Sequence, residues 1–204
     1  MPFVISVALL KGGVSKTTTA LALGEAAALS VPTVIIDTDP MGSMVRWAQL
    51  AEAAGRPLQS TVTGLPVEDL GRRIHPVTRG ATVVIIDTPP PGALALARGA
   101  FEVADQVVMP VPPNLADLDR VPATMKIAAD YGRPAAAVLT QVRGGIEDRA
   151  AAAVTLKSWG VPVYQTELPL TVAVQRAYGQ ALTSGPLLRF GIDLMSEILK
   201  EAQL

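Results

Sequence analysis

The chain has 204 residues, of which 50% are hydrophobic, 4% aromatic and 17% charged, and its formal net charge at pH 7 is −1. This length suits one sizeable domain, whose core has to be built from Ala, Val, Leu and Ile. The absence of cysteine excludes disulfides, thiolate zinc sites and iron–sulfur clusters, and it fits the reducing cytoplasm in which we expect the protein to act.

Apolar strand-like runs alternate with helical patterns along the whole chain. This alternation predicts a single α/β domain over residues 1–204, with a mostly parallel, twisted sheet of about seven or eight strands and helices on both faces. We expect strands at residues 3–9, 34–37, 59–63, 82–87, 106–111, 135–140 and 161–164. We expect helices at residues 16–30, 43–54, 67–73, 93–101, 118–131, 148–159, 172–178 and 187–202.

Residues 11–18, with the sequence KGGVSKTT, lie between the first expected strand and an Ala/Leu-rich helical stretch. A strand, a glycine-bearing loop and a helix in this order form a phosphate cradle, because consecutive backbone N–H groups and the positive end of the helix point at one anion. The strict P-loop pattern fails, since Leu10 and Ser15 stand where its glycines belong, but the variant K-G-G-x-x-K-[ST] fits at every fixed position. The alternative is a Gly-Gly turn with incidental lysines.

Aspartates follow two of the expected apolar strands. Asp37 and Asp39 come after residues 34–36, and Asp87 comes after residues 83–86. A carboxylate at the end of a buried strand reaches the rim of the sheet, where a P-loop enzyme needs one to hold magnesium directly or through water. We therefore predict Asp87 and Asp37 in the magnesium shell and Asp39 as the residue that orients the attacking water. The alternative is that these aspartates only cap helices or begin turns.

These three motifs, in this order and spacing, resemble the deviant Walker-A P-loop ATPases of the ParA/MinD superfamily over roughly the first 120 residues. The proline-rich stretch at residues 108–114 and the short length resemble small plasmid-type ParA partitioning proteins. The resemblance implies a P-loop NTPase fold, ATP and Mg²⁺ as cofactors, hydrolysis of ATP to ADP and phosphate, and a homodimer in the ATP-bound state.

The resemblance also implies a role for each residue of the loop. Lys16 would contact the β- and γ-phosphates, and Lys11 would cross the dimer interface to the partner's phosphates. Both lysines would be catalytic together with Asp39. Thr17 would ligate magnesium and Thr18 would reach the α-phosphate, while backbone N–H groups would come from Gly12, Gly13, Val14 and Ser15.

Two positions of the phosphate loop and its start depart from the family pattern. Ser15 replaces a glycine, and if this residue needs a positive φ, serine costs about 1 kcal/mol or more. Leu10 stands where relatives often carry a polar residue or proline.

By resemblance, the base would be contacted from the loops after three strands, by Pro110, Pro112, Thr140, Gln141 and Pro169.

The sequence does not determine what an ATP-dependent dimer of this kind acts on. By resemblance, a ParA-type partitioning or positioning protein would bind DNA non-specifically as an ATP-bound dimer, associate with the nucleoid, and be released by a ParB-like stimulating protein. Because the net charge is −1, DNA binding would need a local patch. The candidate basic residues are Arg120, Lys126, Arg143, Arg149, Lys157, Arg176 and Arg189.

Two other functions share the nucleotide-binding fold. A MinD-like membrane-positioning ATPase would need a basic amphipathic terminal helix, but residues 187–202 carry Asp193, Glu197 and Glu201 on the polar face, which disfavours membrane binding. No apolar stretch approaches the roughly 20 residues of a membrane span, and no signal peptide is expected. A biosynthetic enzyme like cobyrinic acid a,c-diamide synthase or dethiobiotin synthetase is the other alternative, although a glutamine-dependent amidotransferase would need a cysteine.

Overall fold

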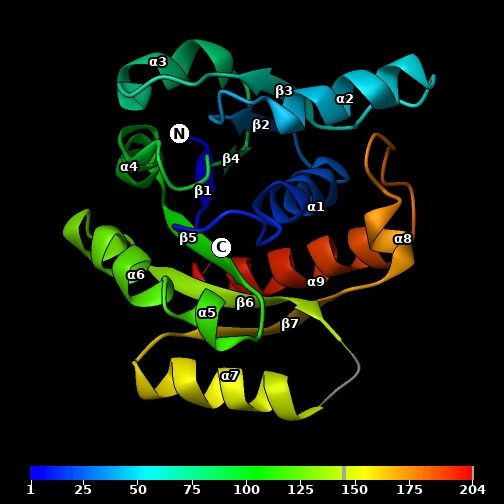
Figure 1. The fold of residues 1–204 in the computed structure, drawn as a ribbon. Helices are drawn as coiled ribbons and strands as arrows, with labels where there is room; N and C mark the ends of the chain where they lie inside the picture. Colours follow the sequence, from blue (N-terminus) through cyan, green and yellow to red (C-terminus); the bar gives the residue numbers. More distant parts are fainter. Residues whose placement is uncertain (144–145, 204) are drawn as a thin grey trace.

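The computed structural model describes residues 1–143 and 146–203. Its strands form one seven-stranded sheet in the order β3-β2-β4-β1-β5-β6-β7, in which every neighbouring pair is parallel (Figure 1). The strands are β1 Phe3–Val7, β2 Thr33–Asp37, β3 Thr61–Gly64, β4 Val83–Asp87, β5 Gln106–Val111, β6 Ala135–Val142 and β7 Val163–Pro169. The predicted parallel α/β sheet is confirmed.

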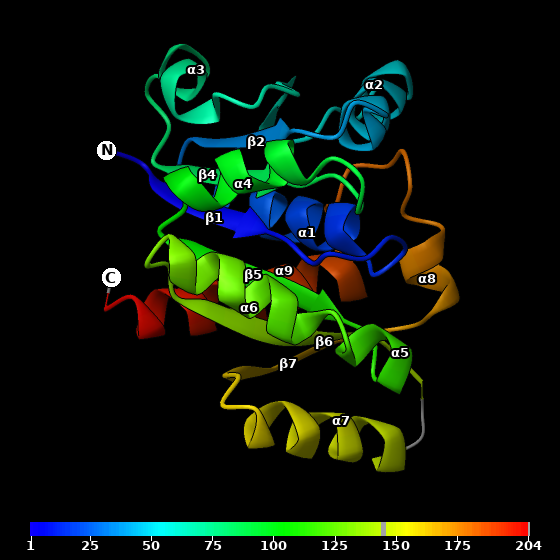
Figure 2. The same ribbon diagram turned by 60° about the vertical axis from the view of Figure 1, so that its left-hand side comes forward.

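Helices cover both faces of this sheet, as Figures 1 and 2 show from two directions. Buried side chains of α1, α2 and α9 share one core with the sheet, and those of α3 to α7 form cores on the opposite face. The helices are α1 Lys16–Ala28, α2 Ser43–Ala53, α3 Leu70–Val77, α4 Leu94–Val103, α5 Leu115–Leu118, α6 Val121–Asp130, α7 Ile146–Ser158, α8 Val172–Gln175 and α9 Pro186–Glu201.

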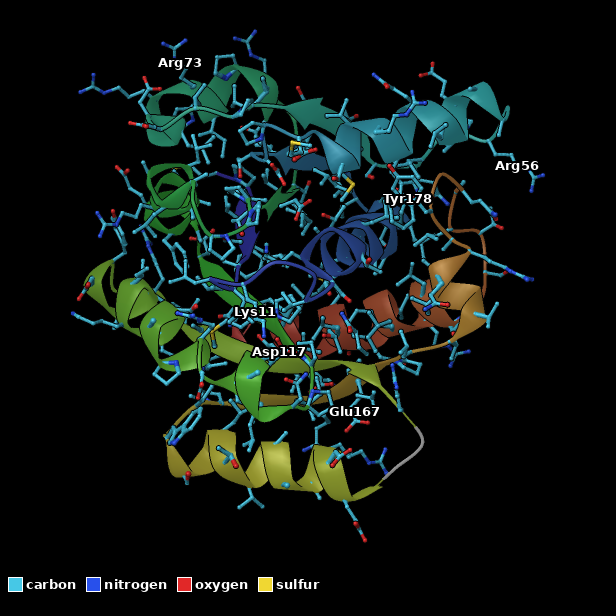
Figure 3. The ribbon with its side chains drawn as sticks, viewed as in Figure 1. Lys11, Arg56, Arg73, Asp117, Glu167 and Tyr178 are labelled. Atoms are coloured by element: carbon cyan, nitrogen blue, oxygen red, sulfur yellow. The ribbon has the colours of Figure 1, made fainter. Side chains whose placement is uncertain are left out.

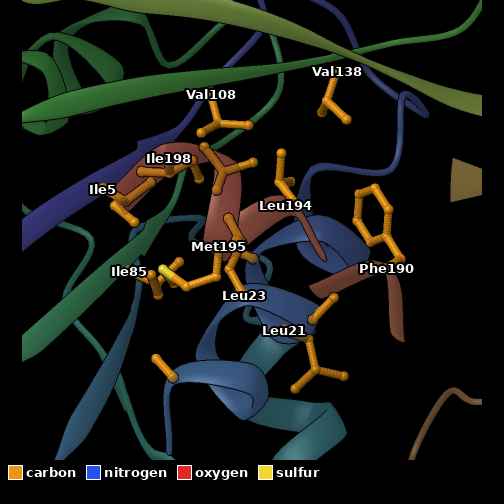
Figure 4. Close-up of a cluster of buried hydrophobic side chains, with 14 of the residues drawn as sticks. Ile5, Leu21, Leu23, Ile85, Val108, Val138, Phe190, Leu194, Met195 and Ile198 are labelled. Carbon is orange, nitrogen blue, oxygen red and sulfur yellow. The ribbon is translucent and has the colours of Figure 1, made fainter. Parts of the chain in front are cut away.

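Helix α1 lies at the centre of the first core. Its residues from Thr19 to Ala27 are all buried, because the helix packs against the sheet and against α9, which lies beside it on the same face (Figure 4). The two helices approach closely at Gly191, where an added Cβ would lie 2.1 Å from the carbonyl oxygen of Ala22. The phosphate loop therefore leads into a helix that is held on several sides.

Two expected elements differ most from the structure in their bounds. The helix expected at 118–131 is α6, which begins at Val121 with Pro122 in its first turn, whereas Leu118 ends a separate four-residue helix, α5, that the Asn114 side chain caps. Strand β7 extends to Pro169 rather than ending at Tyr164, because its pairing with β6 continues through Glu167 and Pro169. The Glu197 carboxylate of α9 accepts from the N–H groups of Gln165 and Thr166 in this stretch.

The other differences are smaller. Helix α3 runs from Leu70 to Val77 instead of 67–73, because Leu70 and Ile74 are the residues that it buries. Helix α8 ends at Gln175 rather than at 178.

In the part of the chain that the structure describes, no helix has both the length and the apolar character needed to cross a bilayer.

The close approach of α1 and α9 can be tested by adding one methyl group. We expect Gly191→Ala to lower the free energy of unfolding by about 1–3 kcal/mol or more, as overpacked cores do, measured by urea denaturation. Gly71→Ala in α3 is the matched control, since its Cβ would lie 3.5 Å from the Val103 side chain. It should be neutral or stabilise by up to about 1 kcal/mol. Equal effects of the two variants would contradict the packing described here.

Candidate functional site

The carboxyl ends of three adjacent strands bring the predicted residues together. In the parallel register, Asp87 at the end of β4 pairs with Val7 of β1 on one side and with Asp37 of β2 on the other. Because neighbouring strands lie about 4.8 Å apart, the start of the phosphate loop and both strand-end carboxylates lie at one edge of the sheet. This edge is where open α/β sheets bind ligands.

The loop between β1 and α1 borders a cavity of about 410 Å³ at this edge. Gly13 and Ser15 both have left-handed backbones, with φ of 74° and 71°. Glycine adopts this conformation freely, whereas serine does so at a cost. Ser15 therefore has the positive φ that the sequence analysis considered, and the protein bears its cost. The cavity is lined by Gly12, Gly13, Ser15, Lys16, Thr17, Thr18, Asp39, Ser43, Thr88 and Pro90.

Lys16 is the buried cation of this site, with only 7% of the residue exposed. Its Nζ donates to the carbonyl oxygen of Lys11 at 2.7 Å, which leaves further ammonium hydrogens for a ligand. Burial lowers the pKa of Lys16, while the charges of Asp87 and Asp39 oppose this shift. The ammonium group is thus held inside the loop next to two carboxylates.

Asp87 is almost completely buried, with 1% of the residue exposed. Neither carboxylate oxygen has a hydrogen-bond partner of good geometry among the described residues. Burial raises the pKa of Asp87 to about 7; the nearby Thr17 hydroxyl opposes the rise, Asp37 and Asp39 add to it, and Lys16 opposes it. A buried carboxylate without a partner is costly, and a bound cation or its water would satisfy it.

Asp37, in contrast, has its hydrogen-bonding capacity largely used by the backbone. Its Oδ2 accepts from the N–H groups of Met44 and Val45 at 3.0 and 3.1 Å, and its Oδ1 accepts from the N–H of Asp39 at 3.0 Å. Burial raises the pKa of Asp37, and these backbone hydrogen bonds oppose the shift. The residue caps the start of α2, while its place in a magnesium shell stays a prediction.

Asp39 lies in the loop after β2, partly exposed and lining the cavity. Its Oδ1 accepts from the N–H of Met41 at 2.9 Å, which fixes the side chain in an Asx turn. Within the described residues, no three acidic or histidine side chains are grouped as a metal site. The carboxylates at this edge therefore do not form a protein-only metal cage.

Lys11 is held within its own chain. Its ammonium forms an ion pair with Asp117 of α5 and donates to the carbonyl oxygen of Ala116 at 3.0 Å (Figure 3). Asp117 in turn accepts from the side-chain amide of Asn114. The sequence analysis missed Asp117, although the Asn114-x-x-Asp117 spacing is a capping pattern that could have placed it at the start of a helix.

The predicted base-contacting residues are only partly brought together. A cavity of about 230 Å³ beside the phosphate loop is lined by Pro112, Pro113, Asn114, Gln141, Arg143, Asp148 and Leu170. Pro110 is buried inside β5, and Thr140 has no exposed surface. Pro169 ends β7 instead of lying in a loop, where it pairs with Val142. Of the five, Pro112 and Gln141 line this cavity, and base contact stays a prediction.

A family model described as the CobQ/CobB/MinD/ParA nucleotide binding domain matches residues 5–184. The chain belongs to this family. The match spans most of the fold, from β1 into the segment before α9, and includes the phosphate loop and the three aspartates. The resemblance to the ParA/MinD superfamily seen in the sequence motifs is confirmed.

Individual members of the CobQ/CobB/MinD/ParA family are also similar to this chain. Maintenance of carboxysome distribution protein A from Gloeobacter kilaueensis is 32% identical over 185 residues, which cover 89% of this chain and 83% of the relative. The fold resembles the MinD–Mg-ADP complex of Pyrococcus horikoshii, with a TM-score of 0.80, 16% identity, and coverage of 99% of this chain and 98% of that one. An ATP complex of a Cyanothece McdA variant has a TM-score of 0.78 at 16% identity and covers 98% and 96% of the two chains.

The different hydrogen bonding of Asp37 and Asp87 can be tested without any ligand. We expect Asp37→Ala to lower the free energy of unfolding by about 1–3 kcal/mol, because three backbone N–H groups lose their acceptor. Asp87→Asn should leave this free energy unchanged or raise it, because the variant removes a buried carboxylate whose oxygens accept no hydrogen bond of good geometry among the described residues. Chemical denaturation of the nucleotide-free protein measures both. A loss for Asp87→Asn as large as for Asp37→Ala would show that Asp87 has a structural partner.

Proposed function

We propose that residues 1–204 act as one ATPase domain, a dimerising switch that uses ATP and Mg²⁺ to position a cargo. The observation that carries the proposal is the phosphate loop, whose buried Lys16 lies beside Asp87, a carboxylate that accepts no hydrogen bond of good geometry among the described residues. The loop offers cationic and N–H groups to phosphates, while Asp87 offers buried oxygens to a cation. Membership of a nucleotide-binding family supports the same ligand.

The residues around the cavity fit MgATP. Lys16 and the loop N–H groups would bind the phosphates, and the Thr17 hydroxyl and Asp87 would hold Mg²⁺ directly or through water. When bound, Mg²⁺ neutralises phosphate charge during hydrolysis. Since Mg²⁺ usually keeps several waters and takes few protein ligands, the absence of a three-carboxylate group within residues 1–143 and 146–203 is compatible with this site.

Lys11 carries the dimerisation part of the proposal. Its ion pair with Asp117 keeps the ammonium on its own chain, next to an open cavity of about 920 Å³ that Lys11, Leu94 and Arg120 help to line. To reach the phosphates of a second chain, Lys11 has to leave Asp117. ATP binding by two chains would supply the competing negative charge, so that Lys11 could stabilise the transition state across the interface.

We propose that the ATP-bound dimer binds DNA non-specifically and that a ParB-like protein stimulates its ATP hydrolysis. Of the candidate basic residues, Arg149 is paired with Glu167 and Lys126 with Asp130. Arg143, Lys157 and the remaining candidates Arg120, Arg176 and Arg189 are exposed. The similarity to a maintenance of carboxysome distribution protein A from Gloeobacter kilaueensis supports a carboxysome-like cargo over a plasmid.

The two alternatives have less support. The buried face of α9 includes Leu187, Leu194 and Ile198, which pack in the core shared with α1; a membrane could not take up this face without unpacking the core. The biosynthetic alternative belongs to the same family. It differs in requiring a small-molecule substrate before ATP is consumed.

DNA binding is expected to depend on the nucleotide. We expect the wild-type protein to be retained on DNA-coated beads with a non-hydrolysable ATP analogue and to be released with ADP or at raised salt, because the contacts would be to phosphates. Size-exclusion chromatography should show a dimer in the first state only. Equal retention with both nucleotides would contradict the switch, and ATP turnover that requires a small-molecule substrate would favour the biosynthetic alternative.

Three substitutions separate the roles of the charged residues. Lys16→Ala should abolish measurable nucleotide binding, because it removes the buried cation of the loop. Lys11→Ala should bind ATP as wild type but lose about 100-fold or more in turnover. Asp39→Ala should bind ATP and dimerise, with turnover reduced by about 100-fold or more.

Calorimetry and a phosphate-release assay measure these effects, with Lys200→Ala on the exposed face of α9 as the control. The control variant should behave as wild type in both assays. Wild-type turnover in Lys11→Ala would rule out the role assigned to Lys11 across the dimer.

A further inference from the structure

The end of β6 contacts the phosphate loop in a way that base binding does not explain. The Thr140 hydroxyl donates to the carbonyl oxygen of Val14 at 3.1 Å. The Gln141 side-chain nitrogen donates to the carbonyl oxygen of Gly13 at 2.6 Å and lies 3.2 Å from the Ser15 hydroxyl oxygen. Two consecutive residues of one strand thus hold three consecutive residues of the loop.

These contacts reach across the sheet, because β5 lies between β1 and β6 in the strand order. The pairing of β6 with β7 is irregular between Leu139 and Val142, and Gln141 has a φ of 55°. The backbone of β6 therefore departs from regular strand geometry at the residue whose side chain reaches the loop. Because the Gly13 carbonyl can only accept, the amide nitrogen of Gln141 has to face it.

Both residues of the Gln141–Ser15 contact have strained backbones. The described residues include three non-glycine residues with left-handed backbones, and two of them, Ser15 and Gln141, contact each other. L-residues with a Cβ avoid this region. Such strain persists where the surrounding structure holds it, commonly at functional sites.

The same contacts fix the direction of two loop N–H groups. In a trans peptide unit, the carbonyl and the N–H that follows it point to opposite sides. Because the carbonyls of Gly13 and Val14 are turned toward β6, the N–H groups of Val14 and Ser15 point away from it. In the described ranges, neither N–H takes part in a hydrogen bond, so both are left for an anion.

We propose that Thr140 and Gln141 are positioning residues for phosphate binding. By holding the carbonyl oxygens of the loop, they orient its N–H groups toward the phosphates, and Gln141 offsets the unfavourable backbone of Ser15. This inference rests on the nucleotide binding proposed above. It gives Gln141 a role that differs from base contact, although the residue also lines the cavity of about 230 Å³.

The experiment compares two ligands that share a phosphate chain, MgATP and magnesium tripolyphosphate, by calorimetry. Gln141→Ala should weaken both by a similar factor, about tenfold for the loss of two hydrogen bonds. Thr140→Val should weaken both several-fold, and Thr140→Ser, which keeps the hydroxyl, should restore binding. Gln175→Ala on the exposed face of α8 is the control and should match wild type.

Two results would overturn the proposal. Tripolyphosphate binding by Gln141→Ala that equals wild type, with the loss confined to MgATP, would identify a direct base contact instead. Unchanged binding of both ligands would show that neither residue orients the loop. Failure of the wild-type protein to bind either ligand would count against the proposed nucleotide site, which keeps the two failures distinguishable.

A ligand-free measurement tests the link between Gln141 and Ser15 independently. Ser15→Gly relieves the left-handed strain but also removes the hydroxyl that contacts Gln141. We therefore expect this substitution to raise the equilibrium constant for folding more in the Gln141→Ala background than in wild type, as measured by a double-mutant cycle. An equal effect in both backgrounds would show that Gln141 does not offset the backbone of Ser15.

Discussion

The parallel register at the centre of the sheet places the charged groups of the site. Asp87 is paired with Asp37 on one side and with Val7, the last residue before the phosphate loop, on the other. A shift of one residue would turn each strand-end side chain to the opposite face. The apolar residues of β1, β2 and β4 are buried on both sides of the sheet, so this register is held by the same packing that forms the core.

The site that results is electrostatically incomplete without a ligand. Lys16 and Asp87 are both nearly buried, and their pKa values move in the directions that favour the uncharged forms, mainly through burial. Asp37 stands beside them with its oxygens occupied by the start of α2. One carboxylate therefore stabilises the fold while its neighbour lacks a partner among the described residues. A carboxylate that is buried without a hydrogen bond lowers the stability of the ligand-free protein, and such groups are expected at binding sites.

Much of the fold could be predicted from the sequence, because buried parallel strands are continuous apolar runs and most of the prolines fall between elements. The predicted ends of helices and strands were wrong where they depend on contacts outside the segment itself. Strand β7 continues through polar residues because it stays paired with β6 as far as Pro169. Helices α5 and α6 separate at Asp119 and Arg120, directly before the first turn of α6 that contains Pro122. Asp117 escaped notice because its partner, Lys11, lies more than a hundred positions earlier in the chain.

The sequence by itself determined the phosphate loop, the aspartates at the strand ends and the class of fold, since each depends on residues that are neighbours along the chain. The tertiary structure decided what those residues contact. It placed Lys11 on Asp117, used Asp37 to cap α2, and made Thr140 and Gln141 donate to carbonyl oxygens of the phosphate loop. The contacts of Lys11, Thr140 and Gln141 join residues more than a hundred positions apart, and they follow from strand order and packing, which no local pattern specifies. The cap by Asp37 is local, and the structure decided it between the two roles that the sequence left open.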